Sequence, residues 1–69
     1  MRRGTTYCYW LEPADKEIIL ANMKRKGIDL LGLSMILRMR NVKNLKRTLD
    51  GEISLNLYRY RELKRRGFL

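Results

Sequence analysis

The side chains best suited to a chemical role are three cations within five residues, Lys43, Lys46 and Arg47, in the stretch NVKNLKRTLDG. When the stretch is wound at roughly 100° per residue, these cations lie on one side and the apolar residues lie on the other. Ammonium and guanidinium groups bind phosphate oxygens and donate hydrogen bonds to O6 and N7 of guanine. The pattern predicts a short amphipathic helix with an outer face suited to a polyanion; a solvated charged face is the alternative.

The rest of the chain offers little catalytic or metal-binding chemistry. It contains no histidine, so its single cysteine, Cys8, has no histidine to activate it, and its carboxylates are scattered. The sequence has no glycine-rich phosphate loop and lacks the residue types that favour a zinc site. We therefore expect no enzymatic activity, no cofactor or metal, and no small-molecule substrate.

The composition indicates the class of partner. Sixteen lysines and arginines against seven acidic residues give a formal charge of +9 on 69 residues, which attracts polyanions at long range. An anionic membrane would attract the same charge. However, no stretch approaches the roughly 20 apolar residues of a membrane span, and the first residues lack the apolar core of a secretory signal. Nucleic acid is the expected partner, no membrane association is expected, and the expected location is the cytoplasm.

Two regions are expected, an N-terminal arm of residues 1–12 and a helical domain of residues 13–69. The aromatic arm alternates loosely between its two sides, which is typical of a strand; an extended arm that packs its aromatic side chains on the helices is an equal alternative. In the domain, the first helix begins at Pro13 and stops at Gly27, with acidic residues in its first turn and cations in its last.

The next two predicted helices are short. The second covers residues 30–38 after an N-cap at Asp29. Because apolar side chains surround it almost completely, we expect it at the centre of a bundle; the alternative is that part of its apolar surface contacts a second subunit or a protein partner. Asn41 is a good N-cap for the third helix, which covers residues 42–50 and stops at Gly51.

The last helix is expected over residues 54–66, with Ser54 as its N-cap. A strand over residues 53–60, paired with residues 5–10, is the alternative, because apolar and polar residues also alternate there. The helix is favoured because strong helix formers follow. Its five cations, including Arg59, are expected to face solvent; the alternatives are that they add phosphate contacts or repel a second subunit. The expected fold class is mainly α, a small domain of four helices, with five as an alternative.

A short helix, a tight connection and a second short helix with a basic outer face form a helix-turn-helix pattern. Residues 28–63 resemble the lambda repressor and Cro family of phage and bacterial regulators. Leu33 and Leu37 stand where that family buries aliphatic side chains, LKRTLDG is similar to the end of its recognition helix, and SLNLYRYRELKRRG looks like its following helix. The connection, residues 38–41, departs from the family because it is one residue longer and lacks glycine.

The resemblance implies a sequence-specific transcriptional regulator, with residues 42–50 in the major groove of double-stranded DNA. It also implies a homodimer that acts in the cytoplasm of a bacterial host cell. The connection is expected to contribute phosphate contacts, and the third helix to contact base edges and phosphate. The expected DNA-binding residues are Lys43, Lys46, Arg47, Asn44, Arg40, Arg38 and Asn41.

A protein-binding module is the alternative function, such as an antirepressor or a small phage inhibitor of a host protein. It is supported by the apolar residues of the second helix together with the aromatic arm, which exceed what a minimal helix-turn-helix needs. Such a module would take a protein partner in place of DNA.

Overall fold

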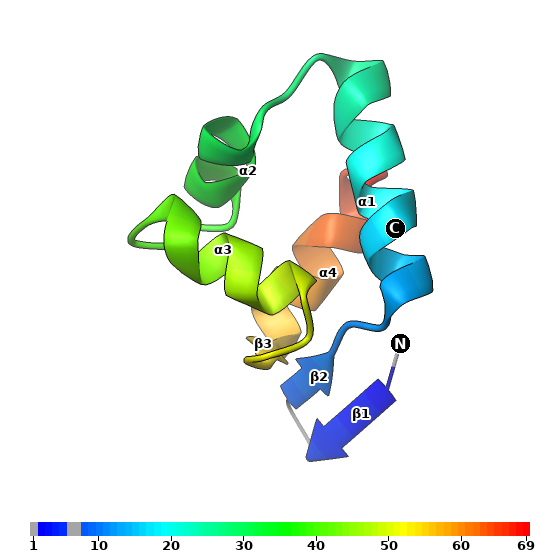
Figure 1. The fold of residues 1–69 in the computed structure, drawn as a ribbon, viewed down its shortest axis with the longest axis vertical. Helices are drawn as coiled ribbons and strands as arrows, with labels where there is room; N and C mark the ends of the chain where they lie inside the picture. Colours follow the sequence, from blue (N-terminus) through cyan, green and yellow to red (C-terminus); the bar gives the residue numbers. More distant parts are fainter. Residues whose placement is uncertain (1, 6–7) are drawn as a thin grey trace.

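A computed structural model describes residues 2–5 and 8–69 of the chain, with side chains from residue 8 onward. Within these residues the fold is mainly helical, as expected, with a small sheet at one end (Figure 1). None of the described helices is both long and apolar enough to cross a membrane. The elements in chain order are β1 (Arg2–Thr5), β2 (Cys8–Trp10), α1 (Pro13–Lys26), α2 (Leu30–Ile36), α3 (Val42–Leu49), β3 (Leu55–Asn56) and α4 (Leu57–Arg65).

The bounds of α1 follow the predicted signals. Pro13 occupies the first helical position, and the carboxylate of Asp15 accepts a hydrogen bond from the backbone N–H of Glu12 at 3.0 Å. Gly27 ends the helix in the left-handed region, with φ 70°, where glycine has no Cβ to clash. The expected helix is therefore confirmed at both ends.

Asparagine and aspartate caps begin the next two helices, also as predicted. Oδ1 of Asp29 accepts a hydrogen bond from the backbone N–H of Gly32 at 2.8 Å, at the start of α2. Oδ1 of Asn41 accepts from the backbone N–H of Asn44 at 2.8 Å, at the start of α3. Each cap satisfies one of the N–H groups that a helix start leaves without an intrahelical partner.

The expectation for α2 is wrong in two respects. The helix ends two residues early, because Arg38 adopts a left-handed conformation with φ 56°. It is also not surrounded by the core: Leu33 and Leu37 are buried, whereas Leu31 and Met35 are 59% and 71% exposed. The helix lies at the side of the molecule (Figure 1), and these two exposed side chains give it an apolar outer face.

The N-terminal arm forms strands, as one alternative expected, and it also packs an aromatic side chain on a helix, as the other expected: the rings of Tyr9 and of Tyr60 on α4 stack with their centroids 4.5 Å apart. β1 and β2 pair antiparallel, and β2 pairs antiparallel with β3, in the order β1-β2-β3. Tyr9 lies opposite Leu55, and Cys8 lies opposite Asn56. The expected strand also covers residues 6 and 7, which lie outside the described part of the chain. The pairing of β2 with β3 is made within one chain.

The predicted start of the last helix is wrong, and the strand alternative accounts for the difference. Leu55 is buried in β3, so the chain is still extended one residue after Ser54. The N-cap of α4 is Asn56, whose Oδ1 accepts from the backbone N–H of Arg59 at 2.8 Å. The segment is therefore a strand for two residues and a helix from Leu57 onward.

One hydrophobic core joins these elements. α4 lies behind α1 and α3 in the view of Figure 1, and the residues after it return to α1. There the side-chain amide of Asn22 donates a hydrogen bond to the carbonyl of Phe68 at 2.9 Å. The buried apolar residues are Leu11, Ile19, Met23, Leu33, Leu37, Leu45, Leu49, Leu55, Leu63 and Phe68.

Candidate nucleic-acid interface

The two sides of α3 confirm the predicted amphipathic helix. Leu45 and Leu49 are buried in the core, and the buried hydroxyl of Thr48 donates to the carbonyl of Asn44 at 2.9 Å. The opposite side is exposed and carries three cations. This surface, called here the α3 cation face, consists of Lys43, Lys46 and Arg47.

The cations of this face differ in their ion pairs. Nε of Arg47 lies 3.8 Å from Oε1 of Glu52, in the segment that follows α3. Lys43 and Lys46 have no ion pair or hydrogen bond to another described residue. Because an exposed pair such as Arg47–Glu52 stabilises little, all three cations can exchange water for an anion. Among the described residues, the two lysines have no partner from which an anion would have to displace them.

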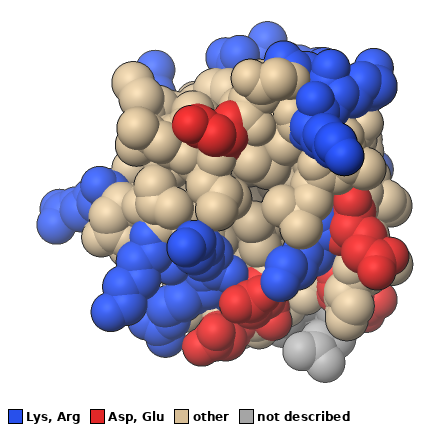
Figure 2. Space-filling model, turned by 45° about the horizontal axis from the view of Figure 1, so that its top comes forward, with Lys and Arg blue, Asp and Glu red and all other residues tan. Residues whose placement is uncertain are grey.

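Acidic residues mark the edge of the basic surface. At the end of α3, Oδ1 of Asp50 lies 2.5 Å from Nζ of Lys16 on α1. Figure 2 shows basic side chains gathered at the lower left, where α3 lies, with acidic side chains beside them at the bottom of the view. Basic side chains gather again at the upper right, and a mostly uncharged surface that also carries acidic atoms in its upper part separates the two groups.

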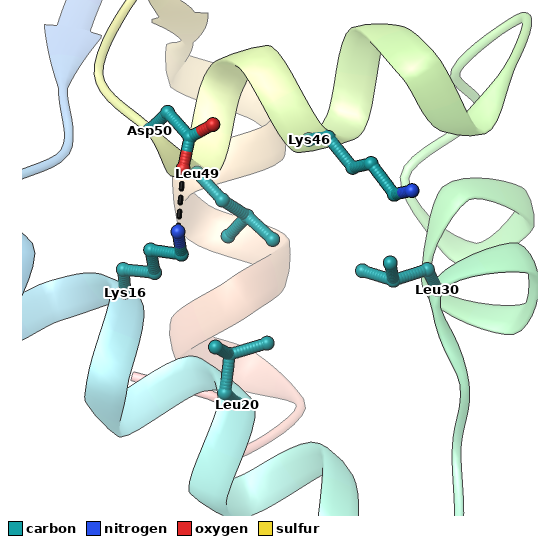
Figure 3. A pocket seen from close by; sticks show the side chains of 6 residues that line it. All are labelled: Lys16, Leu20, Leu30, Lys46, Leu49 and Asp50. Carbon is teal, nitrogen blue, oxygen red and sulfur yellow. Dashed lines mark hydrogen bonds and ion pairs between the residues drawn. The ribbon is translucent and has the colours of Figure 1, made fainter.

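A shallow apolar hollow lies beside the α3 cation face, between α1, α2 and α3 (Figure 3). The side chain of Lys46 extends from α3 toward Leu30 at the start of α2, while the ion pair of Lys16 with Asp50 closes the other side. The hollow has a volume of about 240 Å³. Its lining residues are Lys16, Leu20, Leu30, Lys46, Leu49 and Asp50.

The connection between α2 and α3 is held from α4. The guanidinium of Arg59 donates from Nε to the carbonyl of Leu37 at 2.9 Å, and a terminal nitrogen donates to the carbonyl of Arg38 at 3.2 Å. Arg38 is the residue with positive φ, in a connection that lacks glycine. These bonds satisfy carbonyls that the end of α2 leaves unpaired, and they fix the turn that orients α3.

Arg59 was expected to face solvent, and this expectation is wrong. Its acceptors are backbone carbonyls 21 and 22 residues earlier in the chain. A carbonyl acceptor has no sequence signature, because every residue carries one. The only signal in the sequence was that the connection lacks glycine, which indicates that another side chain must stabilise its backbone conformation.

The remaining predicted contact residues lie along the same segment. Arg38 and Arg40 are exposed in the connection, and Asn44 is half-buried at the flank of α3. The carboxamide oxygen of Asn41 is occupied as a helix cap, so its NH₂ group is the part left to donate. The predicted residues therefore form one continuous stretch, residues 38–47, of which the lysines and arginines are exposed.

Replacing Arg59 by methionine is expected to lower the free energy of unfolding by about 1–3 kcal/mol, because hydrogen bonds from a charged donor are lost while the aliphatic stem is kept. Urea unfolding followed by circular dichroism measures the change. Arg61→Met is the matched control, since Arg61 is exposed on the same helix. Equal stability of the two variants would contradict a supporting role for Arg59.

Comparison of the chain with protein-family models, with curated proteins and with solved structures found no match. The described residues hold no group of three or more histidine, cysteine, aspartate or glutamate side chains placed to bind a metal ion. The fold itself defines a small helical domain with a three-stranded sheet, and the α3 cation face is its candidate site.

Proposed function

We propose that the chain is a sequence-specific double-stranded DNA-binding regulator of transcription, and that α3 enters the major groove. The observation that carries the proposal is that α3 has a buried apolar side and an exposed side with three cations. Buried Leu45 and Leu49 anchor one side of the helix, so the three cations of the α3 cation face lie on its exposed side, with Lys46 at the edge beside α2. α2 packs on α3 across a five-residue connection, which is the order of elements in a helix-turn-helix.

The proposed contacts follow from the chemistry of each side chain. Lys43 and Lys46 donate to O6 or N7 of guanine, because their ammonium groups are exposed and without ion pairs among the described residues. Arg47 binds a base or phosphate by exchanging its weak pair with Glu52. Arg38 and Arg40 bind phosphate, which positions α3 without reading sequence.

The resemblance of residues 28–63 to the lambda repressor and Cro family supports the same proposal and adds a symmetry. A homodimer would place two copies of α3 about one helical turn apart on an inverted repeat. Occupation of such a site blocks a promoter that overlaps it. The formal charge of +9 speeds the encounter with DNA.

Selection of bound duplexes from a random pool tests this function. We expect an enriched inverted repeat, and we expect its affinity to fall linearly with salt on a double-logarithmic plot, with a slope of about −0.9 for each phosphate neutralised. A filter-binding titration between about 50 and 200 mM salt measures the slope. A pool that shows no enrichment, or binding that salt does not weaken, would contradict the proposal.

A protein-binding module is the second candidate function, and a specific observation favours it. Leu31 and Met35 lie one turn apart on the outer face of α2 and are 59% and 71% exposed. Exposed apolar side chains on one helix face are typical of a surface that packs against a partner helix. Under this function, Leu31→Gln with Met35→Gln abolishes partner capture, whereas changes to the α3 cation face do not.

A further inference from the structure

The hollow between α1, α2 and α3 combines apolar walls with a cation that has no ion pair among the described residues. Leu20, Leu30 and Leu49 come from three different helices and form the apolar walls. Lys46 stands at the rim and extends across it toward α2 (Figure 3). The second rim cation, Lys16, is already neutralised by Asp50.

We propose that this hollow binds a small organic acid with an apolar body and a single carboxylate, and that the bound acid forms an ion pair with Lys46. The apolar body lies against the three leucines, where it removes their exposed surface from water. The carboxylate pairs with Nζ of Lys46. One negative charge is the expected number, because Lys46 is the single rim cation left without an acidic partner among the described residues.

The size of the hollow limits the ligand. Its volume of about 240 Å³ is below the roughly 300–1,000 Å³ of sites for drug-sized ligands, but above the approximately 150 Å³ of an engineered cavity that binds benzene. A phenyl ring or a short branched chain therefore fits, whereas a nucleotide or a long acyl chain does not. Because the hollow is shallow and open to solvent, binding is expected in the millimolar range.

Occupation of the hollow has a consequence for DNA binding, and this step rests on the proposed function. Lys46 belongs both to the hollow and to the α3 cation face. A carboxylate on its ammonium group competes with a phosphate or guanine for the same donor. The acid therefore weakens DNA binding by competition at one residue, with no conformational change required.

Titration with benzoate, followed by NMR of the protein, tests the site. We expect saturable shifts confined to the leucine methyl groups of the hollow and to residues beside Lys46. Acetate, which has the charge but no apolar body, and benzyl alcohol, which has the ring but no charge, are expected to bind at least about tenfold more weakly. Shifts spread over all basic surfaces, or no saturation up to tens of millimolar benzoate, would overturn the proposal.

A matched pair of variants identifies the cation. Lys46→Met keeps an unbranched side chain at the rim and is expected to weaken benzoate binding about tenfold. Lys43→Met removes another exposed lysine of α3, which does not line the hollow, and it is expected to leave benzoate binding unchanged. If both changes weakened benzoate binding equally, the binding would depend only on the general positive charge of α3, and the proposed site would be rejected.

A second readout separates this proposal from the proposed function. If the selected duplex binds, benzoate is expected to weaken its binding to the unaltered protein and not to Lys46→Met. If no duplex binds, the proposed function fails, while the benzoate titration still decides whether the hollow is a site.

Discussion

The triple change Lys43→Glu, Lys46→Glu and Arg47→Glu is expected to abolish retention of duplex DNA at low ionic strength. Each reversal removes a phosphate or base contact and places a negative charge against the DNA. Loss of three contacts in a salt-dependent interface corresponds to several orders of magnitude in affinity. Electrophoretic mobility shift with the selected duplex measures the loss.

The fold should survive the triple change, because all three side chains are exposed and the buried side of α3 is untouched. The ion pair of Arg47 with Glu52 is lost, at a cost of at most about 1 kcal/mol for an exposed pair. Circular dichroism and thermal unfolding measure whether the triple variant keeps the fold. A variant that is folded and still retains the duplex would disprove the role of the α3 cation face.

A second triple variant controls for net charge. Lys24→Glu, Arg25→Glu and Arg61→Glu change the formal charge by the same amount, from +9 to +3, at exposed positions on α1 and α4. We expect a modest loss of affinity from weaker long-range attraction. Equal loss in both triple variants would indicate that binding depends on total charge and not on α3.

The parts of the fold that the sequence predicted correctly depend on short-range contacts. Asp29 and Asn41 cap helices through bonds to a backbone group three residues later, so the signal and its target lie in the same stretch of sequence. The two sides of α3 were predicted for a similar reason. The spacing of Leu45 and Leu49 places them on the side of the helix opposite the cations, and this apolar side packs in the core.

The parts that were wrong depend on residues that are distant in sequence. Burial of Leu55 is decided by its pairing with Tyr9, 46 residues earlier, so helix propensity after residue 54 could not locate the start of α4. The exposure of Leu31 and Met35 is similar, because an apolar residue is buried only where another element covers it. The apolar composition of a helix predicts only that burial of its side chains would be favourable. The arrangement of the other helices decides whether one of them packs against it.

The change Gly51→Ala is expected to lower the free energy of unfolding by about 2–4 kcal/mol, combining a left-handed backbone with overpacking. Gly51 ends α3 with φ 78°. A Cβ at this position would lie 2.8 Å from the backbone carbonyl oxygen of Leu11, a buried residue that joins the sheet to α1. The backbone of that junction must move to accept a methyl group. For a domain of this size, with a total stability of roughly 3–10 kcal/mol, such a loss is a large fraction.

Gly27→Ala separates the two causes of this loss. Gly27 has nearly the same backbone conformation, with φ 70°, but a Cβ there would meet nothing within 4 Å. The change at Gly27 therefore includes only the left-handed strain, about 1–2 kcal/mol, part of which the lower entropy of the unfolded chain offsets. Urea unfolding of both variants gives the difference between their losses in free energy of unfolding. This difference measures how tightly the end of α3 packs against the junction at Leu11. Equal destabilisation would mean that the junction yields freely, and α3 would then lack the fixed end that presents its cations as one face.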